Sequence, residues 1–533
     1  MTNIRRITIR SSLRLAFVFV ALAFCLTPAK GEVFADYRVI PRPLQTTLTS
    51  DGGFILKSST KIVYPEGNEK MTRNALFLSD YIKTATGLDL KLECGEAGRN
   101  AIVLSLDSSR GNPEGYTLTV SKRRVTITSS SEAGVFYAIQ TLRKSLPFAT
   151  GQEIELPAVL IEDSPRFSYR GAHFDIARHF YGVEEIERYI DMMVLHNINR
   201  LHLHLTDNQG WRLEIRKYPR LLEIGSKRSF DGEEYGGYLT QDEARQIVRY
   251  AEERYVTVIP EIDLPSHMQA AIASYPSLGC TGSEEQDVLC AGNDTTLQFI
   301  DDVLLELIDI FPSRYIHIGG DECPKTWWEA CPKCQARIKQ LGLSPKDGYT
   351  SEQRLQSFIT SHVADLLARY GRLIIGWDEI LEGGLAASAT VMSWRGESGG
   401  IAAARLGHDA IMTPGDYLYF DHAQSLDTTN EPSSWGGYLP VSQVYSYEPV
   451  PTQLSAEEQR HIIGLQSNLW TEHIATFPHV EYMVLPRWAA MCEVQWSPEG
   501  SKDYPDFLSR LPRLLRWYDA EGYNYAKHVL GKQ

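Results

Sequence analysis

The sequence predicts a (β/α)8 TIM barrel over residues 164–533, preceded by a smaller α+β domain over residues 32–163. Beyond residue 164, eight short apolar runs recur, and most of them are separated by segments with helical periodicity. Before residue 164, alternating strand patterns mix with helical patterns. The polar, proline-bearing segment 162–166 separates the two parts. A barrel of this type needs about 250 residues, so a chain of 533 residues can hold both domains.

The first residues of the chain have the pattern of a signal peptide. Several arginines precede the apolar run 15–26, which is too short for a membrane span, and a Thr-Pro-Ala-Lys-Gly stretch suited to cleavage follows. We therefore interpret residues 1–31 as a signal peptide and expect a periplasmic or secreted protein. An uncleaved anchor is the alternative. Lipidation at Cys25 is less favoured because bulky Phe24 precedes it.

The composition and net charge of the chain limit the kinds of molecule that it is expected to bind. The chain is 43% apolar and 23% charged, which is typical of a soluble globular protein. Its formal charge of −14 argues against a nucleic-acid partner, because phosphate binding needs clustered Lys and Arg. No later segment is apolar over enough residues to cross a bilayer.

In the first domain, segments 116–120 and 124–128 alternate in polarity and are joined by a Ser-Lys-Arg turn, so they predict neighbouring strands. Segments 75–86 and 132–145 have helical periodicity. Together they predict a small mixed domain.

The eight strands predicted for the barrel are 171–176, 200–205, 255–260, 315–318, 373–376, 390–394, 410–413 and 462–465. Helical patterns separate most of them, as in Ile186, Ile190 and Met193 after the first and in 241–254 after the second. The interval between the last two runs is loop-like, so one barrel helix is expected to be missing or displaced.

Residues directly after barrel strands meet at one face of the barrel. Here they are rich in acids, histidine, arginine and aromatic side chains: Asp175, Arg178, His179, Asp207, Glu261, Asp263, His267, Asp321, Glu322, Trp377, Asp378, Glu379, Trp394, Arg395, Tyr417, Tyr419, Asp421, Trp470 and Glu472. Each alone has an ordinary structural explanation as a core residue, cap or ion-pair partner. Their convergence on one rim favours a sugar site, where aromatic faces stack and acids and arginine bind hydroxyl groups.

The octet 315–322, Tyr-Ile-His-Ile-Gly-Gly-Asp-Glu, is the most informative segment. Gly319 and Gly320 allow close approach of a ligand or of another backbone, and Asp321 and Glu322 follow as adjacent carboxyl groups. Taken alone, such an acidic pair more often belongs to a solvated loop or a helix N-cap than to a catalytic site. The sequence shows no clear metal trio, phosphate loop or Gly-x-Ser-x-Gly turn, so we expect no metal or other cofactor. A glycosidase that uses Asp and Glu is the natural interpretation.

Because we expect an exported protein, its cysteines would lie in an oxidising compartment, where disulfides form. Cys280 and Cys290 flank a short polar loop and are predicted to form a disulfide. The pair Cys331-Pro-Lys-Cys334 resembles half of a zinc site, but no second pair at zinc-finger spacing accompanies it. A disulfide within the trio that includes Cys323 is therefore favoured over a metal, with the pairing left open.

Several motifs in order resemble glycoside hydrolase family 20, the β-N-acetylhexosaminidases. The catalytic motif of that family is matched by His-Ile-Gly-Gly-Asp-Glu at 317–322. The resemblance continues in segments 165–171, 175–180, 204–212, 259–267, 376–379, 392–394 and 469–472. The first domain is similar to the accessory α+β domain of the family. One departure is Ser266, where the family usually has glycine, and we expect only a slight local change there.

The resemblance implies catalytic roles. Glu322 would protonate the leaving oxygen, and Asp321 would orient and stabilise the substrate's own acetamido group as it attacks the anomeric carbon. His267 and Asp263 would form a supporting pair near the acid. Adjacent carboxyl groups do not readily flank a sugar from opposite faces, which agrees with a nucleophile supplied by the substrate.

The resemblance also implies binding roles. Arg178 and Glu472 would hold ring hydroxyls, Tyr419 the acetamido oxygen and Asp421 a further hydroxyl. The pocket would be walled by Trp377, Trp394 and Trp470, with Trp435 a less certain member.

The function expected from these features is exo-acting removal of terminal β-linked N-acetylglucosamine or N-acetylgalactosamine, with retention through an oxazolinium intermediate. The expected partners are β-linked N-acetylhexosamine glycans or chitooligosaccharides. Alternatives are a disaccharide-releasing enzyme of the lacto-N-biosidase kind, which needs a longer pocket, and an inactive sugar-binding protein. The sequence does not indicate the natural glycan, the preferred epimer or the oligomeric state.

Overall fold

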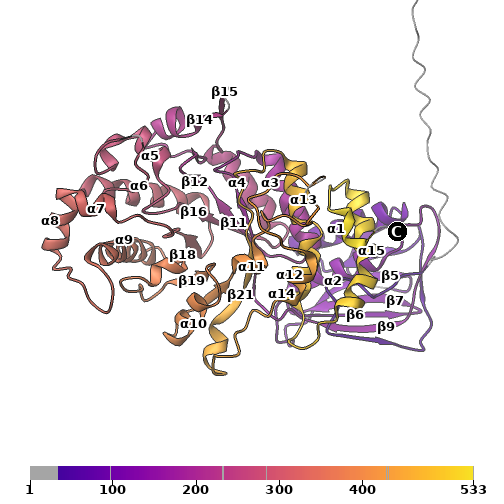
Figure 1. The fold of residues 1–533 in the computed structure, drawn as a ribbon. Helices are drawn as coiled ribbons and strands as arrows, with labels where there is room; N and C mark the ends of the chain where they lie inside the picture. The colour runs from indigo at the N-terminus through magenta and orange to yellow at the C-terminus, as the bar shows by residue number, and fades with distance from the viewer. Residues whose placement is uncertain are drawn as a thin grey trace, which may run out of the picture.

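The computed structural model describes residues 34–531, except 97, 231, 232, 284, 428 and 430. The predicted signal peptide lies outside the described residues. Figure 1 shows the barrel and a smaller α/β domain side by side, with the C-terminal helix α15 (Tyr504–Glu521) lying near the smaller domain. None of the helices within the described ranges is both long and apolar enough to cross a membrane.

The smaller domain contains a seven-stranded sheet in the order β1-β9-β6-β7-β5-β3-β4. Its strands are β1 Gln45–Leu48, β3 Lys61–Tyr64, β4 Lys91–Cys94, β5 Ala101–Leu106, β6 Tyr116–Ser121, β7 Arg124–Ser129 and β9 Val159–Asp163. The short strands β2 (Phe54–Leu56) and β8 (Ile154–Leu156) form a separate antiparallel pair. The predicted hairpin is confirmed as β6 and β7, which pair antiparallel.

Two helices, α1 (Glu69–Thr86) and α2 (Glu132–Ser145), pack against this sheet and against each other. Both predicted helices are thus confirmed, although α1 begins at Glu69, before the predicted start. The side chain of Asn68 accepts a hydrogen bond from the Met71 amide, which satisfies a free amide at the helix start. Gly87 ends the helix at φ 72°, a conformation that glycine adopts without steric cost.

The second domain is a closed barrel of parallel strands. In order around the barrel they are β10 Tyr169–Asp175, β11 Arg200–His204, β16 Thr257–Glu261, β17 Tyr315–His317, β18 Leu373–Trp377, β19 Thr390–Ser393, β20 Ala410–Met412 and β21 Ile462–Ser467. Each predicted apolar run coincides with one of these strands, so the predicted barrel is confirmed.

Helices follow most of the strands. They are α3 Val183–Leu195, α4 Gln241–Glu252, α6 Asp294–Ile310, α9 Ser351–Ala368 and α10 Ser398–Arg405, with α13 Phe477–Val484, α14 Arg487–Trp496, α15 and the 3-10 turn η5 Lys527–Leu530 after the last strand. Smaller elements lie in the connections: β12 Thr206–Asp207, β13 Gly210–Trp211, the π-helical turn η1 Leu221–Gly225, β14 Lys227–Phe230, β15 Glu233–Gly236, α5 Gln269–Ser274, η2 Pro276–Leu278, α7 Thr326–Ala330 and α8 Pro332–Gln340.

Two barrel connections lack a full helix. Between β20 and β21 the described residues form only α11 (Gly415–Leu418), α12 (Val441–Ser446) and η4 (Glu458–His461), as the loop-like pattern predicted. The connection from β18 to β19 contains only the 3-10 turn η3 (Asp378–Leu381), a difference from the predicted pattern. Gly383 and Gly384 follow this turn with φ of 81° and 120°, which does not allow a helix to continue.

The two domains share a buried polar interface. Arg170 of β10 lies 2.8 Å from Glu114 of the smaller domain, and the arginine side chain is 1% exposed. The Trp496 indole donates a hydrogen bond of 3.0 Å to Asp163 at the end of β9. Removing one partner of such a buried ion pair costs about 3–5 kcal/mol, so this contact favours one arrangement of the domains.

The barrel interior is filled by side chains. A cluster of Tyr169, Ile259, Ile375, Trp377, Met392 and Ile411 packs inside it, and Trp394 and Trp470 pack against this cluster. The interior is therefore a packed core, and this core can form the floor of a pocket at the carboxyl ends of the strands.

Candidate active site

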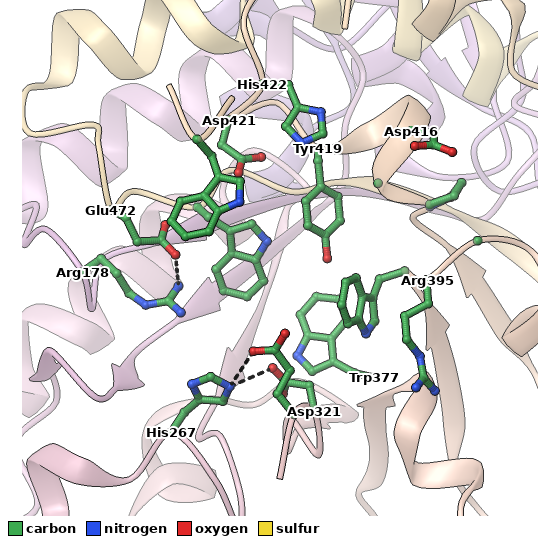
Figure 2. Close-up of a pocket in the computed structure, with 17 residues that line it drawn as sticks. Arg178, His267, Asp321, Trp377, Arg395, Asp416, Tyr419, Asp421, His422 and Glu472 are labelled. Carbon is green, nitrogen blue, oxygen red and sulfur yellow. Dashed lines mark ion pairs between the residues drawn. The ribbon is translucent and has the colours of Figure 1, made fainter. Parts of the chain in front are cut away.

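A cavity of about 470 Å³ lies at the carboxyl ends of the barrel strands. Its lining consists of Arg178, His267, Asp321, Glu322, Trp377, Trp394, Arg395, Gly396, Pro414, Gly415, Asp416, Tyr419, Asp421, His422, Trp435, Trp470 and Glu472. Every residue that was given a catalytic or binding role lines it, except Asp263, which is fully buried. Figure 2 shows Asp321 and His267 on one side of the pocket and Asp421 and His422 on the other.

The two glycines before the acidic pair are required by packing. Gly319 and Gly320 have φ of 64° and 102°. A Cβ atom on Gly319 would lie 1.7 Å from Asp263 Oδ1, and one on Gly320 would lie 2.6 Å from Ile380 Cγ2. Glu322 itself has φ 47°, a strained conformation for a side-chain-bearing residue. The turn is therefore held in a conformation that places both carboxyl groups at the pocket.

His267 connects the two acids. Its Nε2 lies 3.2 Å from Asp321 Oδ2 and 3.6 Å from Glu322 Oε2, as the dashed lines in Figure 2 mark. Its Nδ1 lies 3.4 Å from Asp207 Oδ1. Burial acts to lower the pKa of His267, but the Asp207 and Asp321 carboxylates outweigh it and raise that pKa well above 6.5. The imidazole is therefore a cation at neutral pH, between carboxylates on both sides.

Asp263 lies near His267 and Asp321, as the resemblance implied, but it forms no ion pair with His267. It lies within 4.8 Å of the ligand atoms of His267 and Asp321, but the ion pairs of His267 go to Asp207, Asp321 and Glu322. Its Oδ1 accepts a hydrogen bond from the Gly320 amide at 3.4 Å. Burial, and next the Asp321 charge, raise the pKa of Asp263 well above its usual range. Asp263 thus lies behind the acidic turn with its protonated form favoured, and Asp207 is the charged partner of His267.

A buried network continues below Asp207. His204 Nε2 lies 3.0 Å from Asp207 Oδ2, and its other nitrogen contacts Glu261. Glu261 also lies 3.0 Å from His202 and 2.8 Å from His317, and accepts a bond of 3.1 Å from the Trp377 indole. Charged groups in a low-dielectric interior hold one another in a fixed geometry, so this network orients Asp207 and the pocket floor.

Arg178 lies at the junction of several carboxylates. Its guanidinium is 3.1 Å from Asp175, 2.8 Å from Asp207 and 3.6 Å from Glu472. It also lies 4.9 Å from the centre of the Trp470 ring, within the range of a cation–π contact. The Thr471 amide donates to Asp175 at 3.0 Å, which ties the loop after β21 to β10. Contacts between β10 and the loop after β21 therefore hold Arg178 and Glu472 at the edge of the pocket.

The opposite side of the pocket is built from the β20–β21 connection. Tyr419 stacks on Trp394 with ring centres 6.1 Å apart, and Figure 2 shows its hydroxyl directed into the pocket. The Arg487 guanidinium donates to the carbonyl oxygens of Phe420, His422 and Leu439. One buried arginine thus fixes this long connection.

Two carboxylate oxygens at the pocket have no hydrogen-bond partner among the described residues: Asp321 Oδ1 and Asp421 Oδ1, both buried. Buried polar atoms are normally paired, so these two are the atoms on which a polar ligand is expected to bind. Burial raises the pKa of Asp421 to about 7. This carboxyl can therefore present either a proton or a lone pair near neutral pH.

Several residues in or beside the pocket had no role predicted from the sequence. Glu379 accepts a bond of 3.0 Å from the Trp394 indole, and burial, Asp321 and Asp378 raise its pKa to about 8. Arg395 donates to Asp378 at 2.6 Å. Glu379 and Arg395 were recognised as strand-end residues, but no motif distinguished their roles. Asp416 and His422 flank Tyr419 in an irregular connection, where no periodicity gives a signal.

The described residues contain several groups with the side chains of metal ligands. Inside the barrel, the contacts of Glu261 with His202, His204 and His317, and those of Asp207 with His204 and His267, account for most of these side chains. Another group comprises four cysteines, and none of them lines the pocket. Cys280 and Cys290 are both free, so the predicted disulfide is not formed in the structure. In the folded chain, the start of α8 places Cys331 and Cys334 against the loop that carries Cys280 and Cys290.

Carboxylates, an arginine and tryptophans around the mouth of a (β/α)8 barrel define the site of a glycosidase. The chain belongs to glycosyl hydrolase family 20, whose catalytic-domain model matches residues 167–499 and whose domain 2 model matches residues 36–164. The resemblance found in the sequence motifs is therefore confirmed.

Individual relatives agree with this assignment. The β-hexosaminidase of Porphyromonas gingivalis is 45% identical over 529 residues, covering 95% of this chain and 67% of that protein. The β-hexosaminidase of Vibrio furnissii is 36% identical, covering 70% of this chain and 64% of that protein. The aligned regions thus make up only about two thirds of these relatives. The solved family 20 exo-β-N-acetylglucosaminidase of Vibrio harveyi, in complex with N-acetylglucosamine, is similar with a TM-score of 0.82 and 31% identity, over 93% of this chain and 79% of that one.

Proposed function

We propose that this chain is an exo-acting, retaining β-N-acetylhexosaminidase that removes terminal β-linked N-acetylglucosamine or N-acetylgalactosamine. The β-hexosaminidases of P. gingivalis and V. furnissii and the V. harveyi exo-β-N-acetylglucosaminidase support this reaction. Its substrates would be β-linked N-acetylhexosamine glycans or chitooligosaccharides. The signal-peptide pattern of residues 1–31 supports a periplasmic or secreted location.

The observation that carries the mechanism is that one edge of the His267 ring is directed toward both acids. One nitrogen lies within 3.6 Å of both Asp321 and Glu322. Carboxyl groups that share one imidazole approach a bound sugar from the same side. An enzyme with its own nucleophile instead needs two carboxyls across the scissile bond. The geometry therefore supports an acid and a stabilising group, with the nucleophile supplied by the substrate.

Three other carboxyl groups in or beside the pocket have different environments. Glu472 pairs with Arg178 at 3.6 Å. Glu379 has a pKa raised to about 8 by burial and by the neighbouring acids, so it is mostly neutral at pH 7. Burial raises the pKa of Asp421 to about 7, so this carboxyl is only partly ionised at neutral pH. None of the three is suited to attack an anomeric carbon, which agrees with attack by the acetamido group.

The reaction then has two steps. Glu322 gives its proton to the glycosidic oxygen as the bond from that oxygen to the anomeric carbon breaks. The acetamido carbonyl oxygen forms a bond to the same carbon, and Asp321 stabilises the positive charge that develops on the acetamido nitrogen. In the second step the Glu322 carboxylate takes a proton from water, which adds to the anomeric carbon and opens the oxazolinium ring. Two displacements on opposite faces give net retention. The cationic His267 pairs with the Asp321 carboxylate and lies beside the Glu322 carboxyl group.

The remaining predicted residues would bind the sugar. Asp421, Arg178 and Glu472 offer a carboxyl, a guanidinium and a carboxylate to hydroxyl groups. The Tyr419 hydroxyl would donate to the acetamido oxygen. The indoles that wall the pocket would stack on the C–H face of the ring, namely Trp377, Trp394 and Trp470. Trp435, which is 62% exposed, would contact the part of the substrate nearest the mouth.

Product analysis with chitooligosaccharides of defined length tests the proposal. An exo-acting hexosaminidase releases monosaccharides only, one at a time from the non-reducing end. Release of a disaccharide from a longer chain would assign the disaccharide-specific alternative. Failure to cleave these chains and aryl N-acetylhexosaminides, while still binding them, would assign an inactive sugar-binding protein.

A further inference from the structure

Four cysteines from two separate loops converge in the structure. The sulfurs of Cys280, Cys290, Cys331 and Cys334 all lie within 4.8 Å of one another. Three of the distances are 3.7 Å for Cys290–Cys334, 3.8 Å for Cys280–Cys334 and 3.8 Å for Cys290–Cys331. The first two cysteines lie in the connection after β16, and the last two lie at the start of α8, after β17.

These distances match a tetrahedral metal–thiolate site. Zn²⁺ binds thiolate sulfur at about 2.3 Å, so the sulfurs of a regular tetrahedron are about 3.8 Å apart. A disulfide would require a separation of about 2.05 Å. Cys290 is nearly equidistant from Cys331 and Cys334, and Cys334 is nearly equidistant from Cys280 and Cys290. This arrangement is that of ligands around one centre and not of two separate pairs.

We propose that the four cysteines bind one structural Zn²⁺ ion, with Cys280 and Cys290 as one pair of ligands and Cys331 and Cys334 as the other. Binding converts four thiols into thiolates, which release their protons to the solvent. Four protein ligands leave no open position, so the site would be structural and not catalytic.

The local structure supports thiolate ligands. Cys331 is the N-cap of α8 and Cys334 lies in its first turn, where the helix dipole favours negative charge. Cys290, Cys331 and Cys334 are at most 5% exposed, and Cys280 is partly buried. A Cβ atom on Gly292 would lie 2.3 Å from the Cys334 backbone nitrogen, so glycine is needed for the two segments to approach so closely.

The proposed ion would link the two loops that carry the acidic side of the pocket. The Leu289 amide donates to the Pro265 carbonyl at 2.9 Å, next to the His267 segment. The Trp328 indole of α7 donates to the Leu289 carbonyl at 2.9 Å, which ties in the segment after Glu322. Figure 1 shows α7 and α8 at the end of the barrel away from the smaller domain. Zinc would thus stabilise the loops behind His267 and Glu322, a consequence that rests on the proposed function.

The metal itself can be tested without any activity measurement. Full-length protein purified without chelators or reductants is analysed by elemental mass spectrometry, and denatured samples are alkylated without reduction and mapped. The proposal predicts about one zinc per chain and alkylation of all four cysteines. Absence of metal with these cysteines in disulfides would overturn it, and so would iron in place of zinc.

Variants test the ligands. Cys290→Ser and Cys334→Ser should lower the zinc content to well below half an ion per chain and lower Tm. Cys94→Ser makes the same change at an exposed cysteine of the smaller domain and should keep full zinc content. If a ligand variant does not fold, removal of zinc from the wild type with a chelator provides the second measurement. Tm should fall on removal and recover when Zn²⁺ alone is added, and a Tm unchanged by removal would contradict a structural ion.

Discussion

The two sides of the pocket are built in different ways. The acidic side, formed by His267, Asp321 and Glu322, comes from the loops after β16 and β17, and its groups contact one another directly. The binding side, formed by Tyr419, Asp421, Trp470 and Glu472, comes from the loops around β20 and β21. Between β20 and β21 the described residues form only short helices, and Arg487 fixes this connection through backbone carbonyls.

This difference matches two roles: the acidic side carries out the chemistry, and the binding side recognises the sugar. Proton transfer and charge stabilisation require groups held to within about 0.5 Å, and a network of direct ion pairs on a strained turn provides this. Recognition of hydroxyl groups tolerates variation, and long loops on a rigid barrel permit it. Changes on the acidic side should therefore act on kcat, and changes on the binding side should act mainly on KM.

The largest effect is expected for Glu322→Gln, which keeps the shape of the side chain and removes the acid. General acid catalysis contributes about 10²–10⁴-fold, so kcat should fall by this amount for substrates with poor leaving groups. Aryl glycosides with very acidic leaving groups should lose much less, because they need little protonation. Steady-state kinetics with a series of leaving groups measures this, and an equal loss across the series would show that Glu322 is not the acid.

A smaller effect, mainly on KM, is expected on the binding side for Asp421→Ala. The variant removes a buried carboxyl whose Oδ1 has no partner among the described residues. Loss of a hydrogen bond to a sugar hydroxyl typically costs about 0.5–1.5 kcal/mol, or up to about tenfold in KM. Asp421→Asn keeps an oxygen acceptor and should recover much of the loss. A fall in kcat with unchanged KM would show that Asp421 takes part in the chemistry, as the residues of the acidic side do.

Glu379→Gln should change the pH dependence of stability. The folded-state pKa of Glu379 is raised to about 8 by burial and by Asp321 and Asp378, while in the unfolded chain it titrates near about 4.3. The stability that this carboxyl contributes is therefore fully present below pH ~4.3 and is lost as the pH rises through about 8. Glutamine has no such loss, so Tm of the variant minus Tm of the wild type should grow from pH 5 to pH 9.

Thermal melts across this pH range measure the difference. The control is Glu457→Gln, because the Glu457 side chain is 84% exposed and should give a difference that does not vary with pH. A Glu379→Gln difference that is flat from pH 5 to pH 9 would show that this carboxyl is ionised throughout.

The smallest effect is expected at Ser266. Its hydroxyl donates to the Asp321 carbonyl and links the two loops of the acidic side. Ser266→Ala removes one hydrogen bond worth about 0.5–1.5 kcal/mol, so Tm should fall by roughly 1–2 °C and kcat by less than tenfold. Ser266→Gly should resemble the alanine variant with a further small loss from backbone freedom. Unchanged Tm and kcat in both variants would show that the link does not position Asp321.

Most of the fold could be predicted because each barrel strand is a short apolar run with polar residues after it. The apolar run Tyr315–His317, followed by two glycines and two acids, is one example. The missing helix between β18 and β19 could not be predicted in this way. A run of about a dozen residues is long enough for a helix, and only the positive φ of Gly383 and Gly384 shows that the chain turns instead.

The pocket could largely be predicted because strand ends converge, but pairwise contacts could not. Asp207 and Asp263 both follow barrel strands near His267, and sequence does not show which one contacts the imidazole. The tight packing of Gly319 on Asp263 keeps that carboxyl behind the turn, which leaves Asp207 as the partner. Likewise, the two halves of the cysteine cluster are far apart in sequence. Only the packing of α8 on the loop after β16 brings their sulfurs together.

The central claim, that the substrate's acetamido group is the nucleophile, is tested most directly by comparing two substrates of the wild-type enzyme. One is an aryl β-N-acetylglucosaminide, and the other is the matching β-glucoside, which has a hydroxyl in place of the acetamide. A well-oriented internal nucleophile has a very large effective concentration, so kcat/KM for the glucoside should be lower by about 10⁴-fold or more. Hydrolysis of both at rates within tenfold of each other, or a sugar trapped covalently on Asp321, would contradict the account.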